Sequence, residues 1–216
     1  MDITPPEAHP RRRPQQLGEP IVASKILVLP GSLRNGSFNV ALAAAAALEL
    51  AQLGADVTRI SLADYPLPIM DQNLEALEGI PENALVLGRM IAAQDGIFIA
   101  SPEYNSSIPP LLKNAIDWVS RIRVDEGRET RPWQGRVVAF GSASDGRFGA
   151  ARGLYHLRSV MMAVGAEIVT DQCSVSGASH AFDAEGRLTD ERVRTALTST
   201  CRSLIRHAAA FGRPGG

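Results

Sequence analysis

The sequence lacks most of the features that mark disulfide-bonded, metal-binding, nucleic-acid-binding or membrane proteins. Its 216 residues include only two cysteines, Cys173 and Cys201, whose separation fits neither a disulfide framework nor a metal motif. The four histidines also lack metal-ligand spacing, so we expect no metal site. With 22 basic and 23 acidic residues, the chain has no basic footprint for nucleic acid or a membrane surface. No stretch approaches the roughly 20 apolar residues of a membrane span.

The first 23 residues lack a hydrophobic period and hold five of the fourteen prolines. Such a segment cannot bury enough apolar surface to offset the entropy of ordering, so we predict a disordered tail over 1–23. The three arginines at 11–13 are compatible with an export signal or a basic arm, but residues 14–18 do not form the apolar core that an export signal requires. We therefore expect a cytoplasmic protein with a single domain over 24–212.

Five strand-like segments alternate with five helix-like segments in the rest of the chain. Continuous apolar runs at 26–29, 96–100 and 137–140 are typical of strands buried on both faces of a parallel sheet. Two further strands are predicted, at 56–60 and 166–175. Helical periodicity or composition predicts helices at 37–53, 81–94, 107–122, 150–164 and 189–211. This alternation predicts an α/β protein, a flavodoxin-like three-layer sandwich with a five-stranded parallel sheet in the order 2-1-3-4-5.

The remaining segments are predicted to lack regular structure. Prolines interrupt residues 63–75, which we interpret as too broken for a helix, with Asp71 and Gln72 in a surface loop. Residues 123–131 are charged and contain glycine, as expected of an exposed connection, and residues 177–188 are rich in turn formers. Thr189 is the predicted N-cap of the last helix.

The first strand is followed by the loop GSLRNGSFN at 31–39, which has the properties of an anion site. Glycines 31 and 36 permit tight turns and close backbone approach, and Ser37 is a suitable N-cap for the helix that follows. The unpaired N–H groups and the dipole of that helix favour a negative charge, and Arg34 can supply a counter-charge. Taken alone, the loop is weak evidence, because it matches neither GxxxxGK[ST] nor GxGxxG.

Two more polar loops follow buried strands. After the strand at 96–100, Pro102 ends the ladder, and residues 103–106 lie where a ligand of a parallel sheet is expected, although an ordinary loop with a polar rim fits as well. Residues 142–148 form a third small loop, for which a glycine-rich turn competes with a binding role, and Arg147 in it is a candidate for an anion contact. Because the first, third and fourth predicted strands are neighbours, one ligand can bridge all three loops.

The second loop and the helix after it resemble the NADPH-dependent FMN reductase family, which includes quinone, azo and chromate reductases. The resemblance lies in PEYN at 102–105, Ser107, Pro109 and LKNAIDW at 112–118, and GSLRNGSFN is similar to the family's FMN phosphate loop. It covers roughly residues 25–175. The resemblance implies cofactor-binding roles for Ser32, Arg34, Ser37, Phe38, Asn39, Pro102, Glu103, Tyr104, Asn105, Ser106 and Ser142.

The family resemblance also implies a function. We expect an FMN-dependent oxidoreductase that passes hydride from NADPH or NADH through FMN to quinones, azo compounds, free flavin or metal oxyanions. No side chain needs to act as a general base in the hydride step, so no catalytic residue is assigned. A homodimer, and in some relatives a dimer of dimers (a homotetramer), is expected on the same grounds.

Two alternatives stay open at this point. A flavodoxin-type electron-transfer protein has the same fold and cofactor but no hydride donor site. It predicts a strongly acidic surface and a Thr/Ser-rich phosphate loop, which the near-neutral charge and GSLRNGSFN do not match. The other alternative is a flavodoxin-like binding domain that has lost its cofactor.

Overall fold

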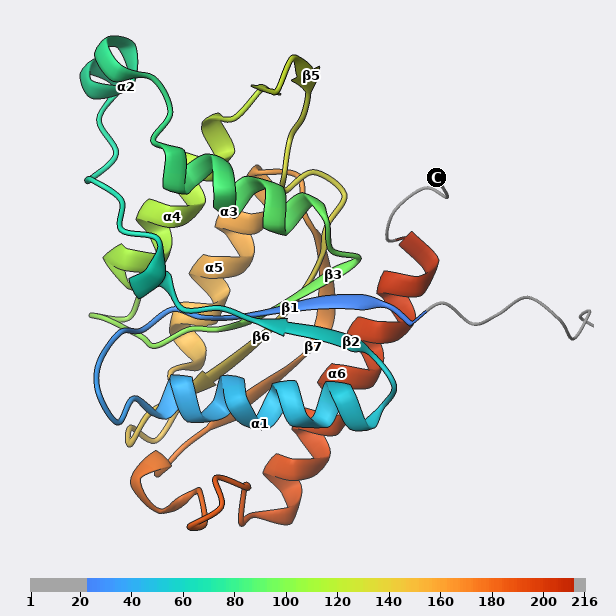
Figure 1. The fold of residues 1–216 in the computed structure, drawn as a ribbon. Coiled ribbons are helices and arrows are strands. Elements are labelled where there is room, and N and C mark those ends of the chain that lie inside the picture. The colour runs from blue at the N-terminus through green and yellow to red at the C-terminus, as the bar shows by residue number, and fades with distance from the viewer. Residues whose placement is uncertain (1–22, 212–216) are drawn as a thin grey trace, which may run out of the picture.

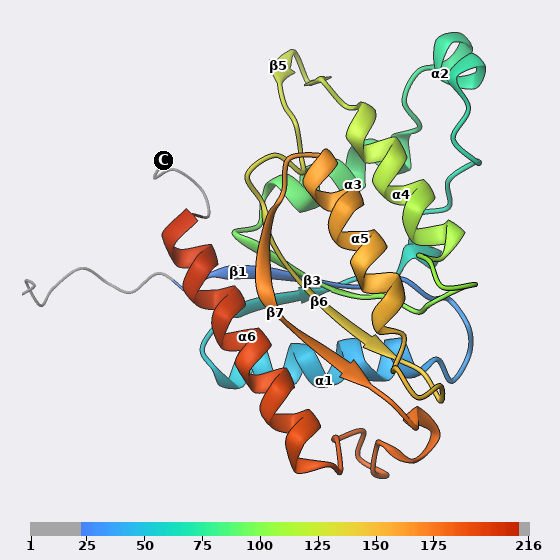
Figure 2. The same ribbon diagram turned by 180° about the vertical axis from the view of Figure 1, so that it is seen from behind.

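A computed structural model describes residues 23–211, which form a five-stranded sheet between two layers of helices (Figure 1 and Figure 2). The predicted tail, apart from Ala23, lies outside the described residues. All adjacent strands are parallel. The strands of this sheet are β1 (Lys25–Pro30), β2 (Asp56–Arg59), β3 (Gly96–Ala100), β6 (Val137–Ala143) and β7 (Glu167–Val175). Their order, β2-β1-β3-β6-β7, confirms the prediction 2-1-3-4-5.

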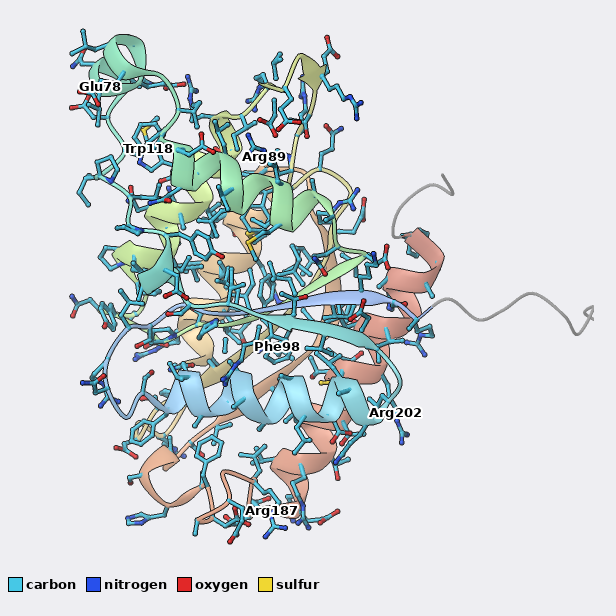
Figure 3. All side chains as sticks on the ribbon, in the orientation of Figure 1. Glu78, Arg89, Phe98, Trp118, Arg187 and Arg202 are labelled. Atoms are coloured by element: carbon cyan, nitrogen blue, oxygen red, sulfur yellow. The ribbon has the colours of Figure 1, made fainter. Side chains whose placement is uncertain are left out.

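Alternating side chains of the central strands build a separate core on each face of the sheet, as the period of a strand requires. Ile26, Val28 and Phe98 pack toward α1 (Phe38–Gln52) and α6 (Glu191–Phe211), while Leu27 and its alternating partners pack toward the other helices. Figure 3 shows Phe98 between the sheet and α1. The helices on the second face are α3 (Glu82–Ala92), α4 (Pro110–Arg121) and α5 (Ala151–Ala163).

Two element boundaries differ from the predicted ones by three residues. β6 continues to Ala143, three residues beyond the predicted end, so Ser142 lies in the strand and not in the loop after it. α4 begins at Pro110 and not at residue 107, because the chain first closes a tight turn ending at Ser107. The apolar runs locate the strands well, but small residues such as Gly141 and Ser142 extend a buried strand without an apolar signal.

The predicted cap of α6 was wrong. Asp190, and not Thr189, caps this helix, because its carboxylate accepts the N–H groups of Arg192 and Val193 at 2.7 and 3.2 Å. The hydroxyl of Thr189 instead donates to the carbonyl of Ala181 at 3.3 Å. A carboxylate at a helix N-terminus also interacts favourably with the helix dipole, which gives Asp190 the advantage over its neighbour.

The prediction that residues 63–75 are too broken for a helix was also wrong. A short helix, α2 (Gln72–Glu78), begins inside that segment, and Asp71 caps it by accepting the N–H of Asn73 at 2.7 Å. The prolines at 66 and 68 precede the helix, so they do not interrupt it. The remaining elements are the 3₁₀ turns η1 (Leu62–Asp64) and η2 (Ala178–His180) and a hairpin of β4 (Val124–Asp125) and β5 (Arg128–Glu129) in the predicted exposed connection.

The segment that carries α2 projects from the body of the molecule and is fastened by one face of α4 (Figure 1). Asn114 accepts the N–H of Met70 and donates to the carbonyl of Pro68, both at 2.8 Å. Trp118, labelled in Figure 3, donates its indole N–H to the same carbonyl at 2.8 Å. Two residues of the LKNAIDW motif thus hold this segment in place. Among the described residues, no helix is both long and apolar enough to span a bilayer.

Asn114→Ala should lower the free energy of unfolding by about 1–2 kcal/mol, because the N–H of Met70 loses its acceptor. Asn83→Ala is the matched control, since Asn83 makes a single exposed hydrogen bond to the carbonyl of Pro66, and it should cost less than about 1 kcal/mol. Urea denaturation of the two variants measures the difference. Equal stability of both would show that the anchoring of this segment contributes nothing.

Candidate cofactor site

The candidate site lies along the edge of the sheet where the parallel strands end, on the left of Figure 1. The loops after β1, β3 and β6 all leave the sheet there, because adjacent parallel strands point the same way. The backbone already joins them: Gly31 donates to the carbonyl of Ala100, and Ser101 donates to that of Gly141, each at 2.8 Å. The structure therefore brings the three predicted loops together.

The first loop, residues 31–37, leads into α1 and presents several hydrogen-bond donors. The N–H groups of Phe38 and Asn39, in the first turn of α1, find no acceptor within residues 23–211. Ser37 is at the N-cap position, as predicted, but its buried side chain makes no capping hydrogen bond. The hydroxyl of Ser37 and two backbone donors are thus available to an anion.

Arg34 gives this loop its positive charge. Its side chain is exposed, and the guanidinium carbon lies 5.5 Å from the ring centroid of Phe38, over the ring. The backbone N–H of Arg34 donates to the hydroxyl of Ser32 at 3.3 Å. No carboxylate forms an ion pair with Arg34 among the described residues, so the guanidinium can serve as a counter-charge to a ligand.

The side chain of Asn39 is committed to the fold. Its amide donates to the carbonyl of Ala143 and accepts the N–H of the same residue, both at 2.9 Å, and only 3% of Asn39 is exposed. This pair of bonds fixes the N-terminus of α1 to the end of β6. Asn39 therefore contributes to the site through its backbone N–H and through the placement of α1.

The second loop contains a tight turn with an unusual backbone. Tyr104 and Ser107 exchange backbone hydrogen bonds of 2.9 and 3.0 Å, and the two residues between them, Asn105 and Ser106, have left-handed φ angles of 50° and 65°. The N–H groups of Asn105 and Ser106 have no acceptor among the described residues. The ring of Tyr104 is half exposed at 51%. Two donors and an aromatic ring are thus presented on a turn of defined shape.

Glu103 in the same loop is largely buried and bound by α5. Its carboxylate accepts two guanidinium N–H groups of Arg152 and the backbone N–H of Gly153. Pro102, just before it, ends the ladder as predicted. The structure places both residues at the edge, but the carboxylate of Glu103 already has its partners.

The third loop, residues 144–149, connects β6 to α5. Ser142 lies buried before it, donating its hydroxyl to the carbonyl of Gly149 at 2.6 Å, so this side chain holds the loop closed. Asp145 accepts the N–H of Ser179, which holds the pKa of that carboxyl below its ordinary value, and His180 and Arg34 act in the same direction. Arg147 is exposed. The third loop thus lies close enough to the first for their charges to interact.

Sequence reasoning missed a fourth segment, residues 176–180 after β7. Ser144 donates to the carbonyl of Val175 at 3.0 Å, and Ser179 donates to Asp145 at 2.7 Å, so this segment packs against the third loop. The signal was available, since β7 is also parallel and must end at the same edge. The turn-forming residues that follow β7 predict an irregular segment but do not say where in the fold that segment lies.

A wide groove of the described structure lies away from this edge. This groove, of about 1190 Å³, runs between α1 and α6, and none of the predicted site residues lines it. Figure 3 labels two of its arginines, Arg187 and Arg202, on the side of α6. We assign the site to the strand edge because unpaired backbone donors, which a phosphate requires, gather there.

The described residues offer no cluster of potential metal ligands. Both cysteines are buried, and burial raises the pKa of the Cys173 thiol to about 12 and also raises that of Cys201. A thiol with such a pKa is not a nucleophile at neutral pH. The groups that this edge offers for ligand binding are therefore hydrogen-bond donors and the guanidinium of Arg34.

A flavodoxin-like sheet, with a loop after its first strand whose donors lack acceptors among residues 23–211, has the architecture of a cofactor-binding α/β protein. The profile of the NADPH-dependent FMN reductases matches residues 24–180. The chain belongs to the NADPH-dependent FMN reductase family. It is accordingly an FMN-dependent oxidoreductase with NAD(P)H as its co-substrate, as the resemblance of the motifs implied.

Individual relatives agree with this assignment. The chain is 37% identical over 182 residues to an NAD(P)H-dependent FMN reductase of Pseudomonas aeruginosa, which covers 83% of this chain and 92% of the relative. It is 37% identical over 146 residues to a quinone reductase of Escherichia coli, covering 67% and 73%. Among solved structures, the flavoenzyme NAD(P)H:(acceptor) oxidoreductase FerB of Paracoccus denitrificans aligns with a TM-score of 0.70 and 27% identity, over 88% of this chain and 100% of the other.

The residues at the edge fit FMN at both of its ends. The phosphate needs donors and a positive charge, which Ser37, the start of α1 and Arg34 offer. The ring needs donors at its polar edge, and the N–H groups of Asn105 and Ser106 are unpartnered within the described chain. The donors that the described chain leaves unused thus form two groups at this edge, one suited to a phosphate and one suited to the polar edge of a ring.

Ser37→Ala should weaken FMN binding by roughly tenfold, because the phosphate loses a hydrogen bond to a charged group. The apoprotein should keep its stability within about 0.5 kcal/mol, since the hydroxyl makes no capping hydrogen bond to α1. Isothermal titration and urea denaturation measure the two effects.

Asn39→Ala is the contrasting variant. It removes both bonds to Ala143 and should lower the free energy of unfolding by about 2 kcal/mol or more. If Ser37→Ala destabilised the apoprotein as much as Asn39→Ala does, the distinction between a binding and a structural side chain would be wrong.

Proposed function

We propose that this protein passes reducing equivalents from NADPH or NADH through FMN to small-molecule acceptors, with quinones as the principal class. Azo compounds, free flavin and metal oxyanions are further acceptors. The observation that carries the proposal is a set of N–H donors at one sheet edge, at the start of α1 and in the turn at 104–107, that find no acceptor among residues 23–211. The name of the Escherichia coli relative, quinone reductase, supports the acceptor class.

The first loop is proposed to hold the phosphate. Ser37 and the N–H groups of Phe38 and Asn39 donate to its oxygens, and Arg34 supplies the counter-charge. Ser32 sets the backbone of Arg34 through its hydroxyl. Phe38, with Arg34 stacked over its ring, keeps that guanidinium beside the loop.

The second loop is proposed to meet the ring. When bound, FMN supplies the redox chemistry, and the protein supplies position and electrostatics. The N–H groups of Asn105 and Ser106 stabilise negative charge at the polar edge of the ring, as preorganised donors do in an oxyanion hole. Pro102 and Tyr104 border the ring, while Glu103 and Ser142 act on the shape of the loops.

We propose that the electron acceptor has no specific pocket, because this edge of the sheet is open. The donors lie on loops, and Tyr104 and Phe148 are exposed at 51% and 60%. Flat aromatic molecules can stack on such a surface without specific pockets. No proton-transfer residue is assigned.

We test the function by mixing FMN-loaded protein with NADPH or NADH in the absence of oxygen. The flavin absorption bands should bleach, and a quinone added afterwards should restore them, with ping-pong steady-state kinetics. Free FMN without protein is the control. A bound flavin that stays oxidised in NADPH and NADH would favour a flavodoxin-type carrier over a reductase.

The protein is further proposed to act in the cytoplasm, where NAD(P)H is available.

We also propose that the protein forms a homodimer that can pair into a tetramer. Tyr155 and Met162, seven residues apart on α5, are exposed at 61% and 66%, and apolar residues at this spacing share one helix face. Tyr155→Glu with Met162→Glu should shift the protein toward monomers in analytical ultracentrifugation. Leu77→Glu, on the projecting α2, is the control, and a wild-type monomer would contradict the proposal.

A further inference from the structure

Helix α5 begins without a cap of its own. Its N-cap residue is Ala150, which has no side-chain acceptor and a left-handed φ of 65°. The first N–H groups of a helix need acceptors from outside it. The carboxylate of Glu103, fifty positions away in the sequence, fills this need by accepting the N–H of Gly153 at 3.0 Å.

The other oxygen of Glu103 binds Arg152 in the first turn of the same helix. The guanidinium donates to it from Nε at 3.0 Å and from Nη2 at 2.6 Å. Only 9% of the Glu103 side chain is exposed, against 56% for Arg152, so the carboxylate is the partner that is shielded from water. One carboxylate therefore caps α5 and ties the second loop to it.

The turn next to Glu103 needs such support. Asn105 and Ser106 both adopt left-handed φ angles, which residues with a Cβ disfavour. A strained backbone of this kind persists only where the surrounding structure fixes it. The turn has only two backbone hydrogen bonds of its own, those between Tyr104 and Ser107.

Helix α5 contacts the turn at two more points. A Cβ added to Gly153 would lie 3.1 Å from the carbonyl oxygen of Ser107, closer than most Cβ contacts, so the absence of a side chain at Gly153 eases this close approach. One turn further along, Nδ1 of His156 lies 3.0 Å from the hydroxyl of Ser107, within hydrogen-bond distance. The start of α5 is thus the rigid element against which the turn rests.

We propose that Glu103 is a positioning residue, which holds the N–H groups of Asn105 and Ser106 in the orientation that receives the FMN ring. It acts through α5 and does not touch the cofactor. This inference rests on the proposed placement of the ring against the second loop. Its consequence is that the shape of the turn, and with it FMN affinity, depends on an ion pair that does not itself contact the cofactor.

Glu103→Ala tests the proposal, with Arg152→Ala as a graded variant and Glu75→Ala as the matched control. Glu75 also forms a partly buried pair with an arginine, Arg121, at 2.9 Å, but on the projecting segment. Two quantities are measured in the apoprotein: the dissociation constant of FMN, and amide hydrogen exchange of Tyr104 and Ser107, whose N–H groups close the turn.

Glu103→Ala should raise the dissociation constant roughly 10- to 100-fold and speed exchange in the turn, because a buried charged acceptor is lost. Arg152→Ala should have a smaller effect, since the bond to Gly153 remains. Glu75→Ala should change neither quantity. If Glu103→Ala does not fold, as judged by circular dichroism, Glu103→Gln replaces it: this variant keeps an acceptor for Gly153 but loses the charge that binds Arg152, and it should weaken FMN binding by a smaller factor.

Wild-type FMN affinity and wild-type exchange in Glu103→Ala, or in its replacement, would overturn the proposal. Equal weakening by Glu75→Ala would also overturn it, because the effect would then be general destabilisation. The placement of the ring is tested separately: if FMN does not slow exchange of Asn105 and Ser106 in the wild type, the proposed function is wrong at this loop, whatever Glu103 does.

Discussion

The candidate site depends on one constraint, the parallel arrangement of β1, β3 and β6 side by side. Because these strands point the same way, the loops after them meet at one edge, although the first and the third lie more than a hundred residues apart in sequence. Backbone bonds from Gly31 to Ala100 and from Ser101 to Gly141 continue the ladder just beyond the strands. The edge is therefore a continuation of the sheet and inherits its rigidity.

Polar side chains at this edge divide into two groups. The side chains of Asn39, Glu103 and Ser142 form hydrogen bonds within the fold, which join loops to neighbouring elements. Ser37 and Arg34, together with backbone N–H groups, are left over for a ligand. A family motif thus contains both kinds of residue, and similarity of sequence alone does not separate them.

Much of the fold was predictable because buried parallel strands leave continuous apolar runs. The runs around Leu27, Phe98 and Val138 identified the central strands, and the order of the sheet followed from connection rules. The errors concerned local structure. Helix α2 was not predicted, because Pro66 and Pro68 suggest a broken segment, whereas both precede the helix and Asp71 caps it.

The site was predictable as a set of loops but not as a set of contacts. The motifs located the turn at 104–107. They did not reveal that Glu103 pairs with Arg152 in the first turn of α5, because the N-cap residue of that helix, Ala150, gives no capping signal in the sequence. The same holds for Ser179, whose bond to Asp145 brings the segment after β7 to the edge. Such contacts depend on side-chain directions that only the folded chain defines.

The most direct test of this account is an amide chemical-shift map of the apoprotein during titration with FMN. The account predicts that residues 32–39 and 103–107 shift together and saturate at one equivalent, with smaller shifts in the third loop. Shifts confined to the groove between α1 and α6, with the strand edge unchanged, would contradict it.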